Sequence, residues 1–221
     1  MSAPLPALSL LETRVLGVLV EKQQTVPDAY PLSLNALVAG CNQKSSRDPV
    51  VEAADADVQA AVDHLRTLSL VVESSGGRVM RFAHNVARVL DVPTQSIALL
   101  ATLMLRGPQT VGELRINTER LHRFADASAL LAFLHELEAR PAGALVGELP
   151  RQSGARETRW THLLSGAPAP AADSETARDN NDVPAVNELA ALRADLARVE
   201  GELAEVKAVV AELRAQLGRT N

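Results

Sequence analysis

The same order of predicted elements occurs twice within residues 1–166, and this repeat limits the fold more than any other feature of the sequence. Ser9 and Glu12 have the spacing of a capping box, in which each side chain binds the backbone N–H of the other residue. We therefore expect a helix from Ser9 to about Lys22. Two prolines then break the chain, and Ser33 begins a short second helix.

The first copy continues with a third helix and a hairpin. Apolar residues recur at helical spacing from about Asp55 or Asp57 to Leu70. Residues 71–82 have valine-rich ends around a Ser-Ser-Gly-Gly centre. This composition predicts two short strands that are joined by a flexible tip.

The second copy contains the same four elements. Residues 94–106 predict a first helix, which a Gly-Pro pair ends. A second capping box at residues 110–113 opens a short helix, and Asp126 or Ser128 caps a third helix. Residues 144–163 then predict a closing hairpin around a Gln-Ser-Gly turn.

Three helices followed by a hairpin is the order of a winged helix, a relative of the helix-turn-helix unit. We therefore predict a mainly α chain with small β-hairpin wings, an α+β fold with two tandem winged-helix domains at residues 1–90 and 91–166. Trp160 is expected to pack under the second hairpin. Residues 167–184 are small, polar and rich in proline, which predicts a flexible linker, and residues 185–221 predict a coiled-coil helix.

The coiled-coil prediction depends on a stripe of leucine and valine that recurs at alternating intervals of three and four residues. Its members are Leu189, Leu192, Leu196, Val199, Leu203, Val206, Val210, Leu213 and Leu217. An average interval of about 3.5 keeps them on one narrow seam of a helix, which needs a partner helix. We expect a homo-oligomer joined through residues 185–217, with its number and helix direction open. The alternative is a helix that folds back onto its own chain.

The composition indicates the nature of the core and the compartment. Only 2% of the residues are aromatic, so we expect an aliphatic core. Cys41 is the only cysteine, which excludes a disulfide framework and a zinc site built from cysteines. The first residues lack a basic, apolar leader, and no run of about 18 apolar residues suggests a membrane span. We expect a cytoplasmic protein that does not bind a membrane.

No segment is basic enough to indicate nucleic-acid binding by itself. Residues 1–90 contain 8 Lys/Arg against 9 Asp/Glu, and residues 91–166 contain 8 of each. The predicted third helices have acidic exposed faces, with Asp57 and Asp63 on the first and Glu136 on the second. Seven cations nevertheless lie where a winged helix meets phosphate. These candidate nucleic-acid contacts are Lys44, Arg47, Arg78, Arg81, Arg151, Arg156 and Arg159. The alternative is that they are solvated loop charges.

The loop from Cys41 to Pro49 has an unusual density of polar side chains. One interpretation is a contact surface for phosphate or peptide. The other is a helix end at which Asn42 and Ser45 satisfy unpaired backbone groups. We favour the second interpretation for Asn42 and the first for Lys44 and Arg47.

The sequence contains no constellation typical of an enzyme. Its 5 histidines are scattered, and none forms a His-x-x-x-His pair of the kind that binds metal. It has no Gly-x-Ser-x-Gly elbow, phosphate-binding glycine loop or dinucleotide fingerprint. Cys41 follows an apolar helix and is expected in the core. We predict no catalytic residue, no metal site and no cofactor.

Several longer strings resemble a known family. They are residues 20–23 (Val-Glu-Lys-Gln), 30–35 (Tyr-Pro-Leu-Ser-Leu-Asn), 41–49 (Cys-Asn-Gln-Lys-Ser-Ser-Arg-Asp-Pro), 105–115 (Leu-Arg-Gly-Pro-Gln-Thr-Val-Gly-Glu-Leu-Arg) and 156–163 (Arg-Glu-Thr-Arg-Trp-Thr-His-Leu). On these strings the chain resembles the YceH family of uncharacterised bacterial proteins, over about residues 8–166. The resemblance implies tandem winged-helix domains, and it brings no assigned function.

Two functions follow from these features. The first is a DNA-binding regulator or accessory factor, in which the coiled coil joins several weak DNA-binding modules and so raises their joint affinity. The alternative is a scaffold for protein–protein interaction that does not bind nucleic acid. A continuous basic strip would favour DNA. Hairpins on opposite sides, or cations paired with Glu52, Glu148 and Glu157, would favour the scaffold.

Overall fold

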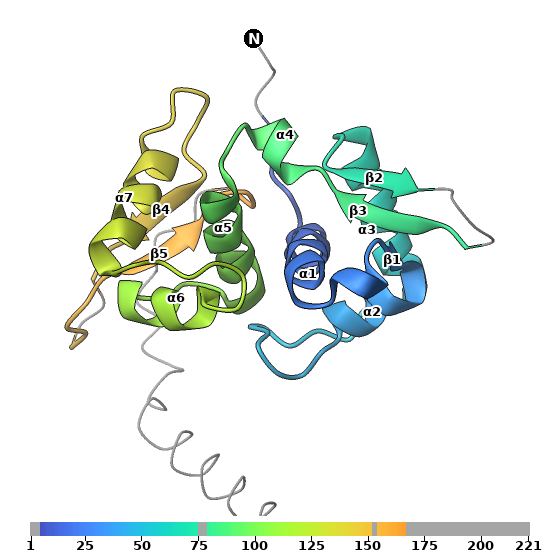
Figure 1. Ribbon diagram of the computed structural model, residues 1–221, viewed down its shortest axis with the longest axis horizontal. Coiled ribbons are helices and arrows are strands. Elements are labelled where there is room, and N and C mark those ends of the chain that lie inside the picture. The colour runs from blue at the N-terminus through green and yellow to red at the C-terminus, as the bar shows by residue number, and fades with distance from the viewer. Residues whose placement is uncertain (1–4, 75–78, 152–153, 167–221) are drawn as a thin grey trace, which may run out of the picture. The chain divides into compact units, whose positions relative to one another are not determined.

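The computed structural model describes residues 5–74, 79–151 and 154–166 (Figure 1). Within these residues the chain is a mixed α+β protein with seven α-helices and two small antiparallel sheets. In chain order the elements are α1 (Leu10–Thr25), the 3-10 helix η1 (Pro27–Ala29), β1 (Leu32–Ser33), α2 (Leu34–Cys41), α3 (Asp55–Thr67), β2 (Val71–Ser74), β3 (Arg81–His84), α4 (Val86–Leu90), α5 (Thr94–Arg106), α6 (Val111–Thr118), α7 (Ala127–Glu138), β4 (Val146–Leu149) and β5 (Arg159–His162). All of them belong to one compact unit.

The predicted order of three helices and a hairpin is confirmed in both copies. The two predicted capping boxes are formed, by Ser9 at the start of α1 and by Thr110 at the start of α6. Asp126 caps α7. The end of the third helix was predicted wrongly, because α3 ends at Thr67 and Ser69 adopts a positive φ of 60° before the hairpin. Helix α4 was not predicted. The predicted linker and coiled coil lie outside the described residues.

In each copy a third stretch of extended chain, just before the second helix, pairs with one strand of the hairpin. The first sheet has the strand order β1-β3-β2, with Leu32 opposite Phe82. In the second copy β4 and β5 form the hairpin, and an isolated bridge joins Gln109 to Trp160 in the place that β1 occupies in the first copy. Trp160 is buried, as expected, and its ring packs edge-on against His135 of α7.

The two copies correspond at the level of single hydrogen bonds. The guanidinium of Arg81 donates to the carbonyl oxygen of Pro31 at 2.8 Å. In the second copy Arg159 donates to the carbonyl oxygen of Pro108 at 3.1 Å. In each case the first residue of the second hairpin strand, which is the central strand of the three paired stretches, ties that strand to the proline that precedes the second helix. The structure therefore confirms an internal repeat.

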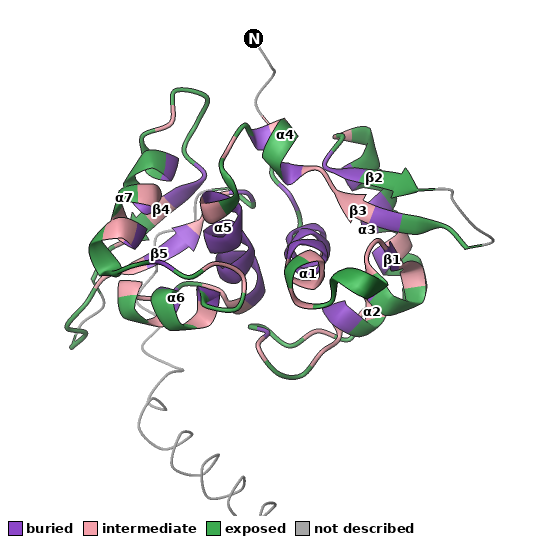
Figure 2. Ribbon diagram, in the orientation of Figure 1, coloured by how far each residue is buried: buried purple, intermediate pink, exposed green. Residues whose placement is uncertain are grey.

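Helices α1 and α5 form the centre of the molecule, where the first helix of each copy packs against the other (Figure 1). Residues 12–20 of α1 and residues 96–105 of α5 are all buried, which Figure 2 shows as continuous purple turns. A helix that is buried on every side needs neighbours all round, and each of these helices is a neighbour of the other. A Cβ atom at Gly17 would lie 2.8 Å from Cγ of Leu105, so glycine at this position lets the two helices approach.

The Gly17 contact can be tested by a single methyl group. We expect Gly17→Ala to lower the free energy of unfolding by about 1–2 kcal/mol, because the overlap with Leu105 outweighs the better helix propensity of alanine. Gly112→Ala in α6 is the matched control. Its Cβ would meet only the Thr110 hydroxyl at 3.9 Å, so this change should stabilise the protein slightly. Urea unfolding of the three proteins measures both effects, and equal stabilities would contradict the packing argument.

Candidate interaction surface

The loop between α2 and α3 carries a buried arginine. The guanidinium of Arg47 forms an ion pair with Glu21 at 2.6 Å and donates to the carbonyl oxygen of Gly40 at 3.1 Å. Its side chain is 0% exposed. Since α2 ends at Cys41, Gly40 provides one of the helix-end carbonyls that lack a partner within the helix. Arg47 therefore stabilises the end of α2, and the expectation that it lies open to phosphate is wrong.

The same loop reaches the ends of other helices. Arg14 of α1 is fully buried and donates to the carbonyl oxygen of Pro49 at 2.7 Å. The backbone N–H of Asp48 donates to Leu105 in the last turn of α5 at 2.8 Å, and Arg106 donates to the Ser46 hydroxyl at 2.6 Å. The loop thus joins the ends of α2 and α5, and the arginines around it, Arg14, Arg47 and Arg106, donate to carbonyl and hydroxyl oxygens within the protein.

Two further expectations for this loop are confirmed. The side chain of Asn42 both accepts from the N–H of Ala53 at 2.8 Å and donates to its carbonyl oxygen at 2.9 Å, so it satisfies backbone groups. Cys41 is buried in the core, and burial raises the pKa of its thiol to about 11. The thiol is therefore protonated near neutral pH and is no nucleophile. Lys44 is exposed and forms no ion pair within the described part of the chain.

The charges of the loop are arranged to keep Glu21 ionised. Burial by itself would raise the pKa of this carboxyl, but the hydrogen bonds and the charge of Arg47 outweigh burial and hold the pKa below its ordinary value. For Arg14, burial and then the nearby charge of Arg47 lower the pKa. A second contact links α3 to α1, where the exposed His64 pairs with the nearly buried Glu12.

The candidate cations of the hairpins differ in their availability. Arg159 forms an ion pair with Glu113 at 3.5 Å in addition to its bond to Pro108. Arg81, Arg151 and Arg156 are exposed. Arg78 lies outside the described residues. Where cations of the candidate set are paired, their partners are Glu21 and Glu113, and within the described ranges none of the set pairs with Glu52, Glu148 or Glu157.

The cations do not form a continuous strip. Figure 1 shows the β2–β3 hairpin and the β4–β5 hairpin on opposite sides of the central α1–α5 pair. Asp55, Asp57 and Asp63 are exposed on α3, between the first hairpin and the loop. The charge of Arg66 on α3 is neutralised by two ion pairs, with Asp63 of the same helix at 3.1 Å and with Glu73 of β2 at 2.8 Å. The exposed side of α3 is therefore acidic.

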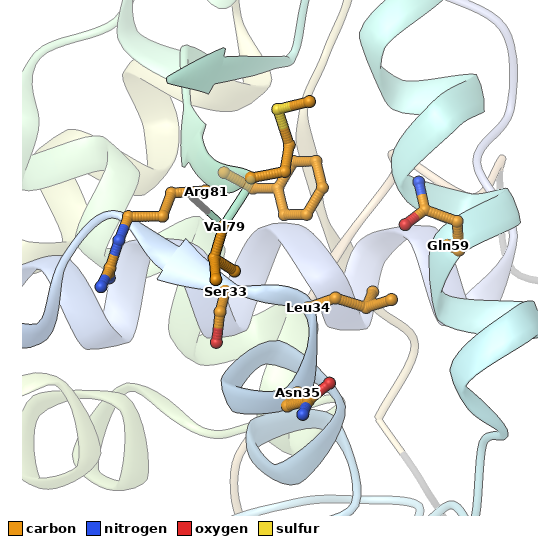
Figure 3. A pocket seen from close by; sticks show the side chains of 8 residues that line it. Ser33, Leu34, Asn35, Gln59, Val79 and Arg81 are labelled. Carbon is orange, nitrogen blue, oxygen red and sulfur yellow. The ribbon is translucent and has the colours of Figure 1, made fainter. Parts of the chain in front are cut away.

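The first copy has an open hollow that the sequence did not predict, with a volume of about 440 Å³. It lies between the start of α2, the middle of α3 and the chain that enters β3 (Figure 3). Its lining residues are Ser33, Leu34, Asn35, Gln59, Val79, Met80, Arg81 and Phe82. Val79 is 57% exposed and Met80 is 47% exposed. A run of two exposed apolar residues beside a hairpin tip was the sequence signal that could have indicated this surface.

Two histidines occupy equivalent positions at the ends of β3 and β5. Each follows an Arg–aromatic–small sequence, as His84 after Arg81 and His162 after Arg159. The Nδ1 atom of each ring is buried without a hydrogen-bond partner. Burial lowers the pKa of both histidines to about 4. Both rings are therefore neutral near neutral pH, and both residues are partly buried.

The described residues offer no other recognisable site. No cluster of three or more His, Cys, Asp or Glu among them has an arrangement that could hold a metal ion. None of the helices in the described ranges combines the length and hydropathy needed to cross a membrane. The fold and surface define a duplicated α+β protein whose distinctive external features are an acidic helix face and an apolar hollow.

Comparison with known proteins places the chain in a family. Residues 8–155 match the family described as "Protein of unknown function, DUF480", and the chain belongs to it. It is 64% identical to a UPF0502 protein of Dechloromonas aromatica over 168 residues, which cover 76% of this chain and 79% of the relative. It is 55% identical to a UPF0502 protein of Methylibium petroleiphilum over 196 residues, or 89% and 84% of the two chains. A UPF0502 protein of Cupriavidus necator is 58% identical over 190 residues, or 85% and 78%.

The structural role of Arg47 predicts a large loss of stability on its removal. Arg47→Ala leaves the mostly buried Glu21 with only the neighbouring Lys22 as a partner, at 3.3 Å, and leaves the Gly40 carbonyl oxygen without its donor. We therefore expect the free energy of unfolding to fall by about 3–5 kcal/mol. Lys44→Ala, three residues earlier, removes an exposed charge and should change it by less than about 0.5 kcal/mol. Denaturant unfolding compares the two variants, and a stable Arg47→Ala protein would contradict the assigned role.

The two equivalent histidines, His84 and His162, predict a fold that is less stable in acid. Between pH 6.5 and 4.5 the unfolded chain binds protons at His84 and His162 that the folded protein excludes, so stability falls as the pH falls. We expect a total loss of about 3 kcal/mol over this window. Glu12 and Glu21 lose their contributions only below pH 4.5, because their pKa values are lowered from that value. In His162→Leu the loss should be about half as large. Urea titrations at several pH values measure it, and an unchanged slope would contradict the assignment.

Proposed function

We propose that the protein is a non-enzymatic adaptor that binds other proteins through two winged-helix modules joined back to back. The observation that carries this proposal is the exposed face of α3, the helix that a winged helix would insert into the major groove. That face presents Asp55, Asp57 and Asp63, which repel phosphate. A protein partner has no such difficulty with an acidic helix.

The single cysteine is buried and unpaired, which fits a reducing cytoplasm.

The winged-helix assignment is supported by the element order and by the third stretch of extended chain. In each copy three helices precede a hairpin, and β1 or the bridge at Gln109 pairs with the second hairpin strand, β3 or β5. The resemblance to the YceH family supports the same assignment. The modules would then be residues 1–90 and 91–166.

A second candidate function is contact with the DNA backbone, because several cations are exposed. They are Lys44, Arg81, Arg151 and Arg156. The buried Arg47 and the paired Arg159 weaken this candidate, since a phosphate would have to compete with Glu21 and Glu113 for them. Four contacts would still give a measurable affinity at low salt.

Fluorescence anisotropy of a labelled random duplex, titrated with full-length protein, distinguishes the two functions. We expect no binding at about 50 mM salt, where four phosphate contacts would be strongest. A variant with Lys44→Ala and Arg156→Ala is the control for any residual signal. Binding that weakens steeply with salt and is lost in this variant would overturn the adaptor proposal and establish the DNA-binding one.

We also propose that residues 185–217 join several copies, which would raise the avidity of weak modules. The support is the heptad spacing of the leucine and valine stripe. Replacing Leu196 and Leu203 by Asp should convert the protein to a monomer in light scattering coupled to gel filtration. Replacing Arg198 and Glu205, which lie off the stripe, by alanine should leave the oligomer intact. A wild-type monomer would contradict the proposal and favour a helix that folds back.

A further inference from the structure

The hollow of the first copy has an apolar wall and an acidic rim. Leu34, Val79, Met80 and Phe82 provide the wall. Gln59 closes the hollow on the side of α3, and Figure 3 shows it across from Arg81 with Val79 and Leu34 between them. The guanidinium of Arg81 donates to the carbonyl oxygen of Pro31. This cation is therefore held on the side of the hollow away from Gln59.

The acidic rim follows from helical spacing. Asp55 and Asp63 lie four residues before and after Gln59, and side chains four residues apart share one face of a helix. Both are exposed, and the Gln59 amide donates to Asp63 at 3.0 Å. Two carboxylates therefore stand one turn to either side of Gln59. Asp63 also pairs with Arg66 at 3.1 Å, whereas Asp55 forms no ion pair among the described residues.

The second copy shows that the fold does not require this arrangement. By the pairing of Phe82 with Leu32 and of Trp160 with Gln109, the positions equivalent to Val79 and Met80 are Glu157 and Thr158. Thr158 donates to Glu148 within the hairpin. A stable module can therefore have polar residues there, and exposed apolar side chains at Val79 and Met80 need a reason other than folding.

We infer that the hollow beside Gln59 binds a segment of a partner protein that presents one large apolar side chain with lysine or arginine about one helical turn away. The apolar side chain fills the space between Leu34, Val79 and Met80, and Met80 adapts to its shape. A cation of the partner pairs with Asp55, and Asp63, which also pairs with Arg66, attracts a second one. A hollow of this size forms a small interface, so the affinity is about micromolar. The inference rests on the adaptor function and names the chemistry of its partner.

The test uses the full-length protein and a phage-displayed library of random dodecapeptides. Peptides that are enriched should contain a leucine, methionine or aromatic residue together with lysine or arginine. In solution, their affinity should fall about tenfold in a variant that carries Val79→Ser and Met80→Ser. Asp63→Asn should weaken binding about two- to fivefold and reduce its salt dependence. All three positions are exposed, so the variants fold.

Matched controls lie on the second copy. Ile116→Ser removes an apolar side chain that is 73% exposed, and Glu136→Gln removes an exposed acid of α7. Neither change should alter the affinity. No enrichment, enrichment of acidic peptides, or binding that is unaffected by the change at Val79 and Met80 would overturn the inference. Peptides that bind elsewhere would leave the adaptor function standing, whereas salt-dependent binding to duplex DNA would remove that function as well.

Discussion

The close packing of α1 against α5 is the contact on which the rest of the structure depends. Each helix begins one copy of the repeat, and each is buried along its middle by its own copy on one side and by the other copy on the opposite side. Gly17 permits this approach because a side chain there would overlap Leu105. With few aromatic residues to fill the core, each small copy gains much of its apolar burial from the other.

The α2–α3 loop follows from this packing. Since the end of α5 lies near the end of α2, one loop can join both, through the bonds of Asp48 to Leu105 and of Arg106 to Ser46. The arginines of this region then have helix-end carbonyls and Glu21 as partners. The arginines in and around the α2–α3 loop thus connect helix ends inside the protein and contribute little to a basic surface.

The repeat also separates structural residues from functional candidates. Features present in both copies, such as the Arg81 and Arg159 bonds to prolines and the neutral histidines that follow, serve the fold. An exposed feature that is present in one copy and forms no contact within the fold is a candidate for another role. The exposed Val79 and Met80 at the hollow belong to the first copy, because Glu157 and Thr158 take their place in the second, and they are therefore the best guide to a partner.

The sequence by itself determined the local elements, because capping boxes, apolar periodicity and glycine-proline breaks act over a few residues. It predicted the helix starts at Ser9 and Thr110, a third start at Asp126 or Ser128, the two hairpins, and the burial of Cys41 and Trp160. It could not show which cations are used internally, because the partners of Arg47 and Arg159 lie 26 and 46 residues away in the chain. Only the tertiary structure decided that the copies share one core, that Arg47 is buried and that a hollow opens beside Gln59. Each of these features depends on distant segments that meet in space, and no local pattern encodes such a meeting.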